Sequence, residues 1–259
     1  MSKKKDKTGE ENINKFGSKM IIIRYKNNSE IDVLFTEYNY IVKNNNYSNF
    51  KTGGITCPYE PREYGIGYLG EGKYKKSENG KMTKCYSMWH NMLMRCYDKD
   101  YQEKNLTYKD CEVCEEWHNF QNFAKWCKDN YYEIDGKIMN LDKDILCKGN
   151  KIYSPQTCVF VPNDINTLFT KRNKKRGNCP IGVRYHKRDK VYEANCDNGN
   201  GKQIYLGRFK SELEAFKIYK SFKETIIKET IDKYENIIPE PYYSKLKEAM
   251  YKYKVEISD

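Results

Sequence analysis

The segment LDKDILCKGNKIYSPQTCVFVPNDIN, residues 141–166, decides the fold expected for the middle of this chain. Its runs at 141–146 and 157–162 have the length and apolar content of short strands. Asn163 suits the N-cap of a helix over 163–171, because an asparagine side chain accepts hydrogen bonds from the first free backbone N–H groups of a helix. The segment therefore predicts a strand, a loop, a second strand and a helix in direct succession.

Two amphipathic helices are expected before this segment, over 86–98 and 115–131, because apolar side chains recur there at helical spacing. The apolar stripe of the second helix is expected in the core rather than against a ligand. The glycine-rich run at 64–84 lacks the strand-then-helix context and the GK[ST] ending of a phosphate-binding loop, so we interpret it as a connector.

The two ends of the chain have different patterns. Residues 1–16 are highly charged and predict a disordered tail, whereas 17–60 alternates β-branched and aromatic runs with Asn-rich turns and predicts a small β module. The segment 171–177 is a basic linker. Residues 178–236 predict a three-stranded antiparallel sheet and one long helix over 211–234, in which Ser211 and Glu214 form a capping box. The C-terminal tail, 237–259, predicts one further helix and a short end strand.

The composition favours small modules with a nucleic-acid partner. The 259 residues are 38% hydrophobic and 32% charged, and the formal net charge is +11. Basic charge attracts phosphate, and the 24 tyrosines offer faces for stacking. An A·T-rich genome, whose codons favour Lys, Asn, Ile and Tyr, explains much of the same composition. The chain also lacks a run of about 18 apolar residues and an apolar signal core, so we expect a cytoplasmic protein, with no membrane partner and with its ten cysteines reduced.

Two segments resemble known families. The pieces GVR, YLGRF and EAF within 178–234 resemble the APETALA-type (ethylene-response-factor-like) DNA-binding domain. The segment from MWHNMLMRCYD through LDKDILCKGNKIYSPQTCVFVPNDIN, about 86–170, resembles the HNH nuclease module of phage homing-endonuclease-like proteins. The resemblance implies a module over 61–170 that contains a ββα-metal unit. Together with the residue patterns, the two resemblances predict an α+β, multi-domain fold with a small N-terminal β module, a central HNH-like module and a C-terminal sheet packed on one helix.

The HNH resemblance implies a metal-dependent phosphodiesterase site. By position, Asp142 and Asn166 match the ligands of a Mg²⁺ or Mn²⁺ ion, and oxygen donors suit such ions. Lys143 occupies the position of the general-base histidine, where a protonated lysine is a poor base and a good phosphate clamp. Strand alternation places Asp144 on the same face as Asp142, as a candidate base or second ligand. Alternatively, these acidic residues cap a tight turn.

Other candidate groups have weaker support. His90 and His118, on the two helices, offer an imidazole for catalysis, although both also suit ordinary helix positions. Cys111 and Cys114 form a CxxC, but no second CxxC follows, so a structural Zn²⁺ is the less favoured interpretation and buried thiols are the favoured one.

The predicted C-terminal sheet offers a face for double-stranded DNA, since a three-stranded sheet can lie in the major groove. Strand alternation and the resemblance give the same outward residues, although an ordinary solvated face has a similar pattern. The candidates on the sheet and its first turn are Arg184, His186, Arg188, Glu193, Asn195, Gln203 and Tyr205. In the basic linker, phosphate contacts are expected from Lys171, Arg172, Lys174, Lys175 and Arg176.

The sequence thus predicts a phage-type DNA-binding endonuclease with a degenerate HNH centre, acting in the cytoplasm of a phage-infected or lysogenic bacterial cell. Asp142, Lys143, Asp144 and Asn166 are its candidate catalytic residues. The rival hypothesis is a catalytically inactive HNH-like binding protein. It would act as a DNA-binding regulator, or as an inhibitor of a host nucleic-acid enzyme through a protein or nucleoprotein partner. Lys143 favours the rival, whereas Asp142 and Asn166 favour the enzyme.

Overall fold

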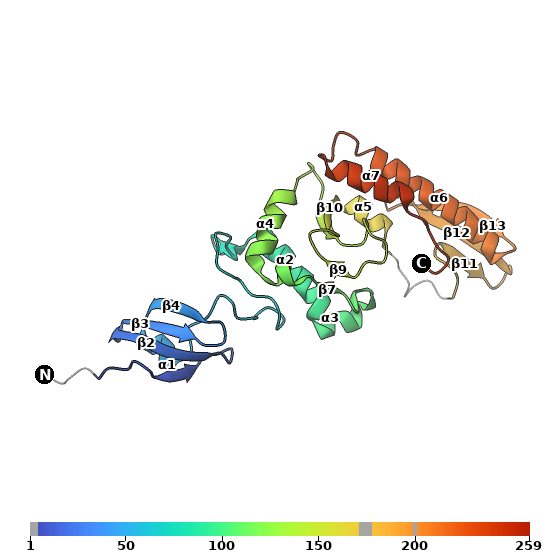
Figure 1. Cartoon of the computed structure of the whole chain (residues 1–259). Helices are drawn as coiled ribbons and strands as arrows, with labels where there is room; N and C mark the ends of the chain where they lie inside the picture. The colour runs from blue at the N-terminus through green and yellow to red at the C-terminus, as the bar shows by residue number, and fades with distance from the viewer. Residues whose placement is uncertain (1–4, 171–177, 199–200) are drawn as a thin grey trace. The chain divides into compact units, whose positions relative to one another are not determined.

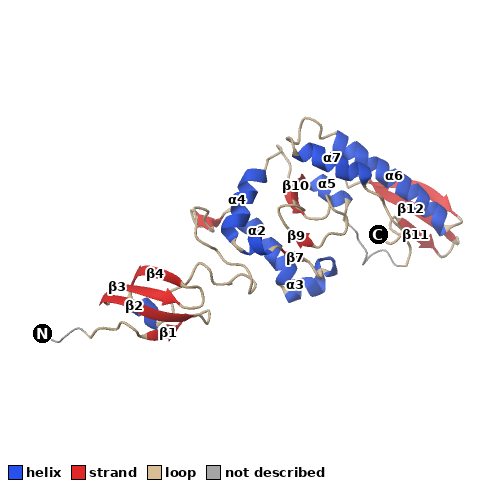
Figure 2. Cartoon of the chain, viewed as in Figure 1, coloured by secondary structure: helices blue, strands red, loops and turns tan. Residues whose placement is uncertain are grey.

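The computed structural model describes residues 5–170, 178–198 and 201–259 (Figure 1). Helices and small antiparallel sheets alternate along the chain (Figure 2), so the predicted α+β class is confirmed. The chain divides into two compact units, residues 1–129 and 130–259. This division falls inside the predicted 61–170 module, and each unit is described by itself below.

The first unit begins with an antiparallel sheet in the order β1-β2-β3-β4, followed by a short helix. Its core contains Met20, Ile22, Val33 and Phe50. The predicted disordered tail is wrong at its end, because residues 11–13 pair with β2 and extend the sheet. The elements are β1 (Glu11–Ile13), β2 (Lys19–Asn27), β3 (Glu30–Phe35), β4 (Tyr40–Asn45) and α1 (Tyr47–Lys51).

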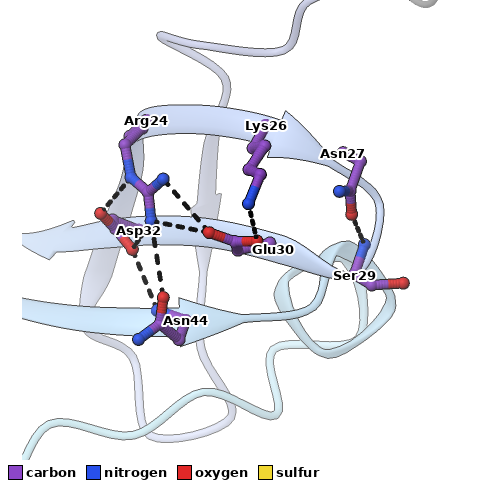
Figure 3. Close-up of polar contacts among 7 residues, drawn as sticks. All are labelled: Arg24, Lys26, Asn27, Ser29, Glu30, Asp32 and Asn44. Carbon is purple, nitrogen blue, oxygen red and sulfur yellow. Dashed lines mark hydrogen bonds and ion pairs between the residues drawn. The ribbon is translucent and has the colours of Figure 1, made fainter.

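A polar cluster joins three of these strands (Figure 3). Arg24 of β2 donates to both carboxylate oxygens of Asp32 of β3, with Nε 2.6 Å from Oδ2 and Nη2 3.1 Å from Oδ1. The same Oδ1 accepts the backbone N–H of Asn44 in β4 at 2.9 Å. The Arg24 hydrogen bond, followed by the Asn44 N–H, lowers the pKa of Asp32. The buried carboxylate is therefore satisfied by partners on both neighbouring strands.

The rest of the first unit is mainly helical. Tyr86, Trp89 and Phe120 pack ring against ring, and Trp89 Nε1 donates to the Trp117 carbonyl at 2.7 Å. The glycine run is a closely packed connector, since a β-carbon on Gly67 would lie 2.3 Å from Leu93 Cδ1. The elements are β5 (Ser77–Glu78), β6 (Lys81–Met82), α2 (Lys84–Tyr97), α3 (Lys99–Lys104), η1 (Leu106–Tyr108), β7 (Glu112–Val113), η2 (Glu115–His118) and α4 (Phe120–Asn130).

The second unit contains the segment quoted first. Strands β8 and β10 pair antiparallel, and α5 follows β10 directly and packs against both strands. The predicted helix over the tail is confirmed as α7, whose Leu246 and Met250 share a core with Ile227 of α6. The predicted end strand is wrong, because residues 253–259 form turns and irregular backbone. The elements are β8 (Met139–Asp142), β9 (Ile152–Tyr153), β10 (Val159–Pro162), α5 (Asn163–Leu168) and α7 (Tyr242–Lys252).

The predicted sheet-on-helix module is confirmed. Strands β11 (Val183–His186), β12 (Val191–Asp197) and β13 (Gln203–Phe209) form an antiparallel sheet in that order, and α6 (Glu212–Asp232) packs on one face. Gly182 lies against α6, since a β-carbon there would be 2.0 Å from the ring of Tyr219. Ser211 is the N-cap of α6 as predicted, but its side chain makes no capping hydrogen bond.

Candidate nucleic-acid interface and metal site

The outer face of the β11–β13 sheet carries the predicted DNA-contacting side chains. Val183, Ala194 and Cys196 are buried against α6, so their alternate neighbours point to the other face. The strand register places Arg184 opposite Glu193, Asn195 opposite Tyr205, and Gln203 opposite Asp197. His186 lies beyond Arg184 on the same face of β11, and Arg188 extends from the β11–β12 turn with a side chain that is 91% exposed.

A β-bulge adds one residue that alternation in the sequence had missed. Ala194 pairs with Gly207 and Asn195 pairs with Tyr205, so Leu206 has no partner of its own. The extra residue reverses the alternation of β13, and Arg208 faces outward opposite Glu193. The available signal was Gly207, since glycine inside a strand often marks a bulge, and its φ of +129° is rarely adopted by other residues.

Charged side chains form a connected cluster on this face. Glu193 lies 3.1 Å from His186 Nε2 and 3.5 Å from Arg208 Nε, and it accepts a hydrogen bond from Asn195 at 2.9 Å. The pKa of Glu193 is lowered, first by the Asn195 hydrogen bond and then by its electrostatic interactions with His186 and Arg208. Arg184 and Tyr205 are exposed and make no side-chain hydrogen bond among the described residues. The face therefore presents the hydrogen-bond donors of Arg184 and Tyr205 to solvent, next to the cluster of side chains around Glu193.

The predicted phosphate contacts of the basic linker lie outside the described residues. Lys171, Arg172, Lys174, Lys175 and Arg176 all fall within 171–177. The candidate nucleic-acid interface is therefore built from the sheet alone.

The β8–β10–α5 segment has the predicted strand–strand–helix order, but its first strand ends earlier than expected. Strand β8 stops at Asp142, whose Oδ1 accepts the backbone N–H groups of Asp144 at 2.8 Å and Ile145 at 2.7 Å. The prediction that strand alternation aligns Asp144 with Asp142 is therefore wrong, because the chain turns between them. In this respect Asp142 caps a turn, as the alternative interpretation expected.

Lys143 is held inside the loop that follows β8. Its side chain is only 8% exposed, and Nζ donates to the Asn150 carbonyl at 3.0 Å and to Asp144 Oδ2 at 3.1 Å. The ammonium also lies 5.7 Å from the centre of the Tyr153 ring. Lys143 therefore stabilises the loop through these partners. The sequence had predicted instead that its ammonium would bind a phosphate.

Polar residues lie on both β8 and α5, which pack against each other. Asn140 and Asp142 share one face of β8, while Asn163 and Asn166 lie three residues apart, on one side of α5. Asn140 Nδ2 donates to Asn163 Oδ1 at 3.2 Å and so joins the two surfaces. The sequence pattern had assigned Asn163 to the N-cap, but the helix begins at this residue and Pro162 precedes it. Asn140 was not predicted at all, because an isolated asparagine in a strand has no distinctive spacing.

The side-chain atoms of β8 and α5 that could bind a metal ion are oxygen atoms. Burial, followed by the nearby charge of Asp144, raises the pKa of Asp142 to about 6. The described residues contain no group of three or more His, Cys, Asp or Glu side chains arranged to hold a metal ion. A single carboxylate, Asp142, with amide side chains on β8 and α5, fits a Mg²⁺ ion only where water and substrate phosphate complete the coordination, as Mg²⁺ sites often require.

The remaining candidates have structural partners in the first unit. His90 Nε2 lies 3.4 Å from the Tyr64 hydroxyl and 3.5 Å from Glu63 Oε2, and His118 Nε2 lies 3.0 Å from the Val113 carbonyl. Cys111 is buried and its thiol donates to the Thr107 carbonyl, Cys114 is half-buried, and neither cysteine is in a disulfide bond among the described residues.

No protein-family model, curated protein or solved structure matches the chain. No helix within the described residues combines the length and the apolar character needed to cross a membrane.

Proposed function

We propose that this chain is a double-stranded DNA-binding protein whose interface is the outer face of the β11–β13 sheet. The observation that carries the proposal is the joint exposure of Arg184, Tyr205 and Arg208 on a face whose other side packs on α6. The arginines can bind phosphate or pair bidentately with guanine, and Gln203 and Asn195 can pair with adenine.

The test compares two double variants in fluorescence anisotropy with labelled duplex DNA. Arg184→Ala/Arg208→Ala removes two charges from the face, whereas Lys233→Ala/Lys245→Ala removes two exposed charges from the end of α6 and from α7. We expect the arginine variant to bind at least about tenfold more weakly, with a salt slope reduced by about 0.9 for each lost phosphate contact. Equal affinities for the two variants would contradict the proposal.

We also propose a second activity, metal-dependent cleavage of the bound DNA. The observation that favours it is the antiparallel β8–β10 pair followed directly by α5, with Asp142 ending the first strand and Asn166 on the helix. A bound Mg²⁺ or Mn²⁺ ion would polarise the scissile phosphate. Asp142 and Asn166 would hold the ion, and Lys143 would fix the adjoining loop through Asp144 and Asn150.

The rival is a binding protein without turnover, as a DNA regulator or an inhibitor of a host nucleic-acid enzyme. The buried Lys143 favours it, because a lysine held by Asp144 and Asn150 stands where the general-base histidine is expected. The chain is incubated with DNA from its own genomic neighbourhood and Mg²⁺ or Mn²⁺. Cutting that is lost in Asp142→Asn, which keeps the turn-capping oxygen, supports the enzyme. Binding without cutting supports the regulator, and neither binding nor cutting points to a protein target.

A further inference from the structure

Two cysteines far apart in the sequence meet in the first unit. Cys85 lies in the first turn of α2 and Cys127 lies in α4, and their Sγ atoms are 2.9 Å apart. Both are free thiols. Since a disulfide bond is about 2.05 Å long, the two sulfur atoms need to approach by only about 1 Å to become bonded.

The two thiols have unequal surroundings. Cys85 is partly exposed, whereas Cys127 is only 1% exposed. The hydrogen bond between the two thiols, with the charges of Lys84 and Lys128, lowers the pKa of Cys85. The same contact and burial raise the pKa of Cys127. A helix N-terminus, nearby lysines and partial exposure are the conditions that make a cysteine nucleophilic.

We propose that Cys85 and Cys127 form a thiol–disulfide exchange pair that reacts with low-molecular-weight disulfides such as oxidised glutathione. The Cys85 thiolate attacks one sulfur of that disulfide, its S–S bond breaks, and one glutathione thiolate leaves. Cys127 then transfers its proton to solvent and attacks Cys85 Sγ, and the second glutathione leaves as a thiolate. The two protein thiols lose two electrons and oxidised glutathione gains them, so the exchange balances.

The bond would link α2 to α4 across 42 positions of the sequence. Closing a loop of that length restricts the unfolded chain, so oxidation is expected to raise the melting temperature of the first unit. All three tryptophans, residues 89, 117 and 126, lie in this unit, so tryptophan fluorescence reports its unfolding selectively. Disulfide formation at this pair requires neither DNA binding nor DNA cleavage.

The test treats the full chain with oxidised glutathione and maps the cysteine peptides by mass spectrometry without reduction. We expect a Cys85–Cys127 crosslink in the wild type, with the melting temperature raised. Cys127→Ser removes the resolving thiol and is expected to accumulate a stable glutathione adduct on Cys85. Cys85→Ser is expected to leave Cys127 reduced.

Two other cysteines serve as internal references. The exposed Cys147 should accept glutathione in every variant, whereas Cys114, whose pKa is raised by burial, should stay reduced. A wild-type protein in which Cys147 is modified while the Cys85–Cys127 pair stays reduced would overturn the proposal. A stable adduct on Cys85 of the wild type would overturn it as well. Cys127→Ala gives the same readout if the serine variant fails to fold.

Discussion

Glu193 is the anion at the centre of the proposed DNA-binding face. It forms an ion pair with Arg208 and lies beside His186 in the free protein, and its charge repels DNA phosphates. We therefore expect Glu193→Gln to bind duplex DNA about threefold to tenfold more tightly at low salt, an electrostatic gain that shrinks as salt rises. Anisotropy titrations at several salt concentrations measure it, with the exposed Glu235→Gln as the control. Weaker binding by Glu193→Gln would instead indicate that the carboxylate accepts a hydrogen bond from a cytosine.

Lys223 is a buried ammonium on α6, only 8% exposed. Burial lowers its pKa, opposed by the charges of Cys196 and Asp197. The folded state therefore binds this proton more weakly than the unfolded state does, so between the folded pKa and the ordinary value of 10.5, stability contributed by this group rises with pH. Below that window the charged lysine destabilises the fold.

Replacing Lys223 tests whether its charge destabilises the folded state. Lys223→Met should be more stable than wild type at pH 7 by about 1–3 kcal/mol, and the difference should shrink as the pH approaches 10.5. Urea unfolding at several pH values measures it, with Lys217→Met as the exposed control on the same helix. A difference that is constant across pH would show that the charge of Lys223 is not the cause.

At the element scale, close packing of Gly182 on α6 fixes the sheet to its helix. Gly182 has a φ of +77°, and an added β-carbon would overlap the Tyr219 ring. Gly149 has a similar φ of +83° with no atom within 4 Å of its β-carbon position. Gly182→Ala should therefore destabilise the second unit by about 2–4 kcal/mol, and Gly149→Ala by about 1 kcal/mol. Circular dichroism during urea unfolding measures both, and equal losses would show that backbone strain alone is responsible.

The elements that the sequence predicted well are those with a long periodic pattern. The stripe of Trp117, Phe120 and Phe123 is buried as expected, and the 178–236 sheet and helix have the predicted order. Short elements were less accurate. Strand β8 ends at Asp142 because the carboxylate of this residue accepts hydrogen bonds from two backbone N–H groups that follow it. Such a bond competes with strand pairing, and the spacing of apolar residues gives no sign of it. The same applies to Lys143, whose burial depends on Asn150, seven residues away.

At the scale of the whole molecule, the C-terminal tail is part of the second unit. Leu246 of α7 is fully buried among residues of α6, and Lys148 Nζ bonds the Lys254 carbonyl and the Asp259 carboxylate. Leu246→Ala should destabilise this unit by about 2–5 kcal/mol, because it removes buried methyl groups and leaves a cavity. Its exposed neighbour Lys245→Ala is the control.

The placement of tryptophan separates the two units in this experiment. Urea unfolding of Leu246→Ala should shift the part of the circular dichroism transition that belongs to the second unit, while the midpoint of the tryptophan fluorescence transition stays unchanged. A common shift of both signals would mean that the two units unfold as one cooperative body.

The bulge in β13 has a consequence for anyone who wishes to reprogram this protein toward another target. A mutagenesis library designed on simple alternation would randomise positions 203, 205 and 207. One of these three positions is Gly207, whose φ of +129° few other residues adopt. The extra residue at Leu206 shifts the phase, so the useful positions are 203, 205 and 208. Deleting Leu206 would restore simple alternation and keep Arg208 outward opposite Glu193, whereas a strand of the present length without the bulge would turn Arg208 toward α6, so the length of this strand, as well as its composition, encodes which side chains meet the partner.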